Sequence, residues 1–197
     1  MERLTVVVRR RALRPVALGL LAVMLTGCPG RGEGNDMESA QAQLQARPSY
    51  EAAEADYLAM LNEMRAAFNA VNPDLLWLDK PGVFNEGFCA PPFSDVDQAA
   101  SANYDSGDAA GELTPAQWEQ AAQGVAAVGA RHGFTHVERL KNGPSQFYVV
   151  LHGRWDDKVE FGYEANRVVL SVYGACFIRT VPATPYDPFT EDATPSS

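Results

Sequence analysis

The chain has few of the residues from which most catalytic and metal sites are built. Only three histidines and three cysteines occur among its 197 residues. A serine-hydrolase nucleophile elbow needs a Gly-x-Ser-x-Gly sequence, and none is present. Cys89 and Cys176 have no second cysteine or histidine at metal-ligand spacing. We therefore predict no catalytic residue, no metal ligand and no cofactor, and we expect the protein not to be an enzyme.

The apolar segment near the N-terminus is too short to span a membrane. It runs over eleven residues from Pro15 to Leu25, whereas a transmembrane helix needs about 17 to 25. Five arginines precede it, as in a secretory signal peptide. We predict a lipoprotein signal peptide over residues 1–27, because the segment ends in Leu25-Thr26-Gly27-Cys28, a pattern typical of a lipobox. The Arg9-Arg10-Arg11 run also fits a twin-arginine signal loosely, which leaves the export route open.

In this interpretation the Cys28 thiol carries diacylglycerol, and the chain is cut before this residue. Two acyl chains are enough for stable anchoring to a membrane. We therefore expect a protein held by its lipid on the extracytoplasmic face of the cell membrane.

Basic residues are scarce once such a signal peptide is removed. Its loss takes five arginines and one glutamate and leaves 11 basic and 24 acidic residues, a formal charge of −13. A surface of this charge repels nucleic-acid phosphates and anionic headgroups. We therefore expect no nucleic-acid partner, and we expect attachment to the membrane through the lipid alone.

With Cys28 committed to the lipid, Cys89 and Cys176 remain as an even pair in an oxidising compartment. Such a pair is most simply a disulfide. Free thiols or metal-bound thiols are the alternatives.

Composition divides the exported chain into three parts. Residues 28–48 are rich in Gly, Glu and Gln, which predicts a flexible tether. Residues 49–181 are predicted to form a single domain of ordinary size. Residues 182–197 carry a proline every few positions, which predicts a disordered tail. In this tail Thr184, Thr190 and Thr194 are candidates for O-linked sugar.

Two helices are predicted within the domain. The first follows Ser49 as N-cap and ends at Asn72-Pro73, with apolar residues at three- and four-residue steps that we interpret as core. The second begins with a capping box at Thr114. It ends at His132-Gly133, and its predicted buried face comprises Trp118, Ala121, Ala122, Val125 and Val128.

The remaining apolar runs predict strands. A short buried strand is expected over 75–78, followed by an acidic loop over 90–111. Four extended runs come after the second helix: Phe134 to Leu140, Phe147 to Gly153, Lys158 to Tyr163, and Arg167 to Ile178. The order helix, strand, helix and antiparallel meander predicts an α+β fold with both helices on one face of a largely antiparallel sheet.

Two groups of polar residues are weak candidates for a site. His136 and His152 lie on adjacent predicted strands and, with Asp156 or Asp157, would form a metal or acid/base site if they converged. Solvent-facing side chains are the preferred interpretation, and we expect no zinc there. In the acidic loop, Asp95, Asp97, Asp105 and Asp108 suggest calcium, but they lack the ligand spacing of an EF-hand. A solvated loop is preferred there as well.

Several short stretches resemble the LppA-like lipoproteins of actinobacteria. They are Ser49 to Ala53 at the start of the first helix, Trp77, Cys89, His132-Gly133-Phe134, and Gly174 to Phe177 in the last strand. The resemblance covers roughly residues 49–181, and only the long loop over 90–111 departs from it. It implies a lipid-anchored envelope protein, and it supplies no catalytic residue.

Three classes of function follow. The leading one is a non-catalytic interaction or binding module of the cell envelope, whose partner is an unidentified envelope protein. The second is a carrier of an apolar ligand, which needs a cavity between helices and sheet lined by residues such as Trp118, Phe147 and Phe161. The third is an envelope hydrolase or metal protein, which needs the histidines and acids to converge.

Overall fold

The computed structural model describes residues 33–78, 82–143 and 146–181. The predicted signal peptide, the lipidation site Cys28 and the Pro- and Thr-rich tail lie outside these residues. The described elements are three helices and eight strands, in the order α1 (Glu33–Gln45), α2 (Tyr50–Val71), β1 (Leu76–Trp77), β2 (Gly82–Gly87), β3 (Ala99–Asp105), β4 (Ala109–Ala110), α3 (Pro115–Arg131), β5 (His136–Asn142), β6 (Gln146–His152), β7 (Lys158–Glu164) and β8 (Arg167–Ile178). None of these helices is long and apolar enough to cross a membrane.

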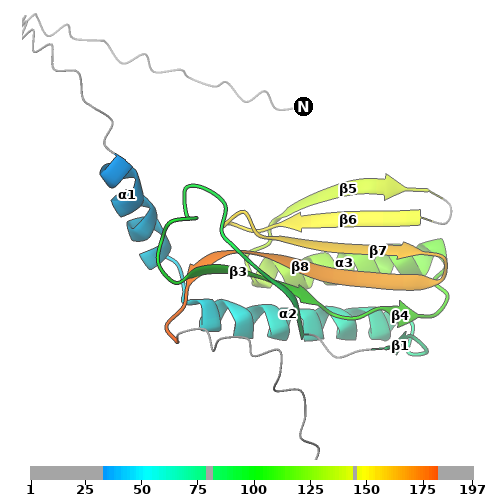
Figure 1. Ribbon diagram of the computed structural model, residues 1–197. Coiled ribbons are helices and arrows are strands. Elements are labelled where there is room, and N and C mark those ends of the chain that lie inside the picture. The colour runs from blue at the N-terminus through cyan, green and yellow to red at the C-terminus, as the bar shows by residue number, and fades with distance from the viewer. Residues whose placement is uncertain (1–32, 79–81, 144–145, 182–197) are drawn as a thin grey trace, which may run out of the picture. The chain divides into compact units, whose positions relative to one another are not determined.

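All eight strands belong to one antiparallel sheet (Figure 1). The main strand order is β1-β4-β8-β7-β6-β5. β8 is the longest strand: it pairs with β7 on one side, and with β4 and then β3 on the other. β2 pairs with β3 alone. The predicted meander is therefore confirmed as β5 to β8, and the α+β class is confirmed.

Helices α2 and α3 cover one face of this sheet (Figure 1). The Ser49 Oγ accepts a hydrogen bond from the Ala52 N–H at 3.2 Å, and Thr114 forms the predicted capping box with Gln117. Every residue predicted for the buried face of the second helix is buried. The two helices and the inner face of the sheet enclose one hydrophobic core, centred on Phe68, Trp118 and Phe161.

The structure differs from the predicted tether over residues 28–48. Residues 33–45 of this segment form α1, which belongs to the same compact unit as the domain. Ala40 and Leu44 are buried against Val96 and against partly buried residues that include Phe93 and Ile178. The prediction of a tether failed because only two residues of α1 are buried, and two apolar positions give almost no periodicity that would indicate a helix in the sequence.

Two further expectations are wrong in detail. The strand expected over 75–78 is the two-residue edge strand β1, in which Leu76 is 68% exposed, and only the preceding Leu75 is buried. The acidic loop expected over 90–111 contains β3 and β4. β3 is held as a strand by its pairing with β2 and β8 rather than by its own alanine-rich sequence.

Candidate binding site

A hollow of about 220 Å³ lies where the first turns of α2 face the turn between β6 and β7. We call it the Trp155 hollow. Its wall comprises Ala52, Ala53, Asp56 and Tyr57 from α2, His132 after α3, Arg154, Trp155 and Asp157 from the β6–β7 turn, and also Pro48 and Phe177. Sequence segments about a hundred residues apart therefore meet in one concave site.

The Trp155 hollow contains a buried carboxylate. Asp157 is 5% exposed, and its Oδ2 accepts a hydrogen bond of 2.8 Å from the hydroxyl of Tyr57. Its Oδ1 accepts a hydrogen bond of 3.2 Å from the Trp155 N–H. A Cβ at Gly153 would lie 2.1 Å from this Oδ1, so the turn needs a glycine at that position. The carboxylate is thus held in one orientation by backbone and side chain together.

The Tyr57 hydroxyl is a fixed donor. Burial, reinforced by the neighbouring Asp157 carboxylate, raises the pKa of Tyr57 far above its usual value. The phenol therefore stays protonated at physiological pH and does not act as a base or nucleophile. In this state the Tyr57 hydroxyl is the hydrogen-bond donor to the Asp157 carboxylate.

The rim of the hollow is formed by His132, the C-cap of α3. Its Nδ1 lies 2.8 Å from Asp56 Oδ1, and its Nε2 lies 3.6 Å from Glu63 Oε1. Glu63 in turn pairs with Arg131. Since both ring nitrogens of His132 face carboxylates of α2, this histidine joins the two helices at the mouth of the hollow.

Two arginine guanidinium groups lie over the Trp155 ring. The guanidinium carbon of Arg154 is 4.8 Å from the ring centroid, and that of Arg47 is 5.1 Å from it. Cation–π contacts of this length favour one orientation of the ring. These contacts favour the position of Trp155 in the wall of the hollow.

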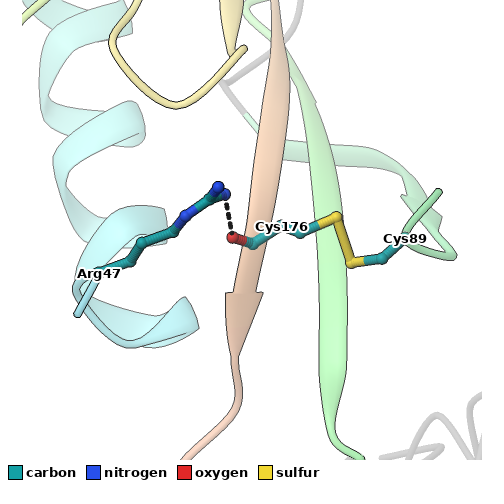
Figure 2. Close-up of a disulfide and its surroundings, with 3 residues drawn as sticks. All are labelled: Arg47, Cys89 and Cys176. Carbon is teal, nitrogen blue, oxygen red and sulfur yellow. Dashed lines mark hydrogen bonds between the residues drawn. A yellow bond between two sulfur atoms is a disulfide. The ribbon is translucent and has the colours of Figure 1, made fainter. Parts of the chain in front are cut away.

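Arg47 connects the Trp155 hollow to the disulfide. Its guanidinium donates a hydrogen bond of 3.0 Å to the carbonyl oxygen of Cys176, which is bonded to Cys89 (Figure 2). Desolvation lowers the pKa of Arg47, and the nearby acids Asp156 and Asp157 oppose this shift. A second hollow of about 290 Å³, lined by Arg47, Phe93 and Cys176 among others, lies on this side and shares Trp155 with the first.

The structure confirms the predicted disulfide between Cys89 and Cys176, with Cα atoms 5.7 Å apart. Cys89 follows β2, and Cys176 lies in β8. The bond therefore fixes the edge strand β2 to the last strand, although these strands are not paired with each other.

His136 and His152, considered above as the less favoured possibility of a metal or acid/base site, do not converge with Asp156 or Asp157. His136 and His152 face each other across β5 and β6 with ring centroids 5.3 Å apart, and His152 pairs with Glu138. Asp157 instead faces Tyr57, in the hollow that His132 borders. In the described part of the chain, no three His, Cys, Asp or Glu side chains are arranged to hold a metal ion.

The acids of the predicted loop are dispersed as well. Asp105 accepts a hydrogen bond from the Gly107 N–H, and Asp108 pairs with Arg167 at 2.9 Å. Asp95 accepts a long hydrogen bond from Ser94. Neither these three acids nor Asp97 belong to a group of side chains that could hold a cation in the part of the chain that the structure describes.

The side chains expected to line a carrier cavity pack against one another. The ring of Trp118 lies 5.3 Å from that of Phe147 and 5.8 Å from that of Phe161, measured between centroids. All three are almost completely buried. Aromatic contact fills the space that an apolar ligand would need.

The sequence singled out Asp157 as a polar candidate and named His132 only as the end of the second helix, and it missed the other members of the site. Tyr57 lies within the apolar stripe of α2, which sequence periodicity assigns to the core. Arg47 and Trp155 acquire their role only when the segment after α1 brings Arg47 over the Trp155 ring. A tryptophan within the polar turn Arg154-Trp155-Asp156-Asp157 was the one available signal.

Comparison with known proteins finds one matching family and similar solved structures. A family model described as "LppA, lipoprotein confined to pathogenic Mycobacterium" matches residues 27–180. A crystal structure of LppA from Mycobacterium tuberculosis superposes with a TM-score of 0.60 at 18% identity, over 79% of this chain and 95% of that one. A DUF4853 family protein from Actinomyces odontolyticus gives a TM-score of 0.51 at 13% identity, over 75% and 79% of the two chains. No curated protein matches the chain.

Proposed function

The chain belongs to the LppA lipoprotein family, and from this we propose that it is anchored through lipid on Cys28 at the extracytoplasmic face of the cell membrane. The match begins at residue 27, directly before the predicted acceptor cysteine. A pairing of two cysteines as a disulfide fits an oxidising, exported location. The strongly acidic exported chain offers no electrostatic attraction to anionic lipids, so the lipid is the expected means of attachment.

We further propose that the domain is a non-catalytic binding module whose ligand enters the Trp155 hollow. The observation that carries this proposal is the buried Tyr57–Asp157 pair beside a tryptophan that makes cation–π contacts with Arg47 and Arg154. These groups form a concave wall and are held by hydrogen bonds and cation–π contacts, which supports recognition of a ligand. The volume of about 220 Å³ suits a single side chain or a small polar group of an envelope partner.

The anchor is tested by Cys28→Ala. We expect this variant to lose membrane association in a fractionation experiment while its circular dichroism spectrum keeps the folded signature, because Cys28 lies outside the domain. Persistent membrane association of the variant after a high-salt wash would contradict the proposed anchor.

The hollow is tested with tryptophan substitutions at two exposed alanines of α2. Ala52→Trp places an indole in the hollow, and Ala66→Trp places the same indole on the helix away from it. We expect the purified soluble domain to bind isolated mycobacterial cell envelopes saturably, and Ala52→Trp to weaken this binding about tenfold. Equal binding by wild type, Ala52→Trp and the Ala66→Trp control would show that the hollow is not the binding site.

A further inference from the structure

The sheet has a second face, opposite to the one that α2 and α3 cover (Figure 1). The register of β6, β7 and β8 aligns residues in rows across this outer face. One row is Gln146–Glu164–Arg167, and the next is Tyr148–Gly162–Val169. These residues line a groove of about 330 Å³ with Asp108 at one end, and its volume lies within the range of about 300 to 1,000 Å³ usual for ligand pockets.

The groove exists because Gly162 has no side chain. A Cβ at this position would lie 2.7 Å from Cδ2 of Tyr148 and 3.0 Å from the carbonyl oxygen of Phe147. The tyrosine ring therefore packs directly on the backbone of β7. On the other side of Gly162, the side chain of Val169 is 37% exposed although it is aliphatic and central in the sheet.

The Tyr148 ring is held rigidly in this place. Its hydroxyl donates a hydrogen bond to Glu160, and Glu160 also accepts one from Lys158. The ammonium of Lys158 lies 4.6 Å from the ring centroid of Tyr173. Desolvation, with the hydrogen bond to Glu160, raises the pKa of Tyr148, so this phenol stays neutral. An aromatic side chain fixed on an exposed sheet face gives a ligand a surface that needs no reordering on binding.

The polar groups of the groove are fixed in pairs. Gln146 donates a hydrogen bond to Glu164, and Arg167 pairs with Asp108 at 2.9 Å. Carboxylate, amide and guanidinium groups thus offer directed donors and acceptors with a small net negative charge. The charges of Asp108, Glu164 and Arg167 sum to −1, which disfavours a phosphate, and an ammonium ion would meet only the Glu164 carboxylate, because Arg167 already neutralises Asp108.

We propose that this groove binds a neutral saccharide. A sugar ring carries an apolar C–H face, which fits Tyr148 and Val169, and a hydroxyl edge, which fits Gln146, Glu164 and Arg167. No other element of the described chain covers the groove. The site is distinct from the Trp155 hollow and does not depend on it.

The test titrates the soluble wild-type domain with mannotetraose, maltotetraose and chitotetraose and follows backbone amide shifts by NMR. We expect at least one of them to shift resonances of β6, β7 and β8 with a Kd on the order of 1 mM. Tyr148→Ala and Val169→Lys should each weaken this binding about tenfold or more. Val137→Lys is the matched control. Val137 is exposed, but it pairs in register with buried Leu151 and so lies on the face of the sheet opposite to the groove.

The proposal is overturned if none of the three oligosaccharides shifts these resonances at about 10 mM. It is also overturned if Val169→Lys and Val137→Lys, both folded by their NMR spectra, bind as wild type does. Preferential binding of inorganic phosphate or spermidine in the groove would show that it recognises charge and is not a saccharide site.

Discussion

Removal of the Cys89–Cys176 disulfide should cost a large part of the stability of this domain. The bond closes a loop of 87 residues that contains β3, β4, α3 and β5 to β7. In the chain-entropy description, a loop of this length loses about 15 cal/mol/K in the unfolded state, which corresponds to about 4 to 5 kcal/mol at room temperature. Domains of this kind have a total stability of about 5 to 15 kcal/mol.

The structure indicates where the effect should concentrate. β2 pairs only with β3, and α1 packs against a cluster that includes Cys176 and Ile178. Arg47, directly after α1, donates to the Cys176 carbonyl. Loss of the bond therefore loosens the edge strand and the support for α1 together, while the core between α2, α3 and the sheet keeps its contacts.

The assay is urea unfolding of the soluble domain followed by tryptophan fluorescence. We expect Cys89→Ala/Cys176→Ala to lower the free energy of unfolding by about 4 to 5 kcal/mol and to raise the m-value, because the unfolded chain becomes more expanded. Wild type in reductant should match the double variant, and the melting temperature should fall by about 10 to 20 °C. A loss below about 1 kcal/mol would refute the reasoning, because it would mean that the crosslink hardly restricts the unfolded chain.

Two further outcomes follow from local geometry. Desolvation acts to raise the pKa of Glu51, but the hydrogen bonds that its carboxylate accepts, first from its own backbone N–H and then from Thr180 and Val181, outweigh this and lower the pKa from 4.5 to about 2. The stabilisation of the folded state by these hydrogen bonds is therefore complete above pH 4.5 and is lost as the pH falls toward 2. Glu51→Gln should remove this pH dependence of the urea midpoint, and the change in the free energy of unfolding should be at most about 1 kcal/mol because the site is exposed. The same dependence of the urea midpoint on pH in Glu51→Gln and in wild type would contradict this prediction. In α3, Gly129→Ala should destabilise the domain by up to about 2 kcal/mol, because the new Cβ would lie 2.6 Å from buried Leu151. The control Gly124→Ala, whose Cβ would lie 3.4 Å from the Ala67 Cβ, should be neutral or should stabilise the domain through helix propensity. Equal unfolding midpoints for these two variants would argue against close packing of α3 on β6.

The parts of the fold that the sequence predicts are those with strong local signals. α2 and α3 carry caps and apolar stripes, and β8 carries a long apolar run, so their bounds agree with the prediction closely. β3 has the sequence AASANYD, which lacks β-branched residues. Its strand state depends on pairing with β8 along one side and β2 along the other, and such tertiary pairing leaves no period in the sequence.

The candidate site shows the same limit. Asp157 is recognisable as a turn acid, but its burial depends on the position of Tyr57, a hundred residues earlier in the chain. Trp155 becomes a fixed wall because Arg47 arrives from the segment between α1 and α2. Sequence reasoning that treats residues 28–48 as a tether removes Arg47 from the domain and cannot find this contact.

The presence of α1 also changes what the proposed lipid anchor can do. A tether from Cys28 to Ser49 would hold 21 residues, with a reach of up to about 70 Å when extended. With α1 docked through Ala40 and Leu44, only four residues lie between Cys28 and Glu33, and the five Cα–Cα steps that join them span about 18 Å at most. A lipid on Cys28 would therefore keep the start of α1 close to the bilayer surface. The ligand of such a protein is then expected within the membrane-proximal layer of the envelope, since a domain held on so short a connection cannot search the outer layers.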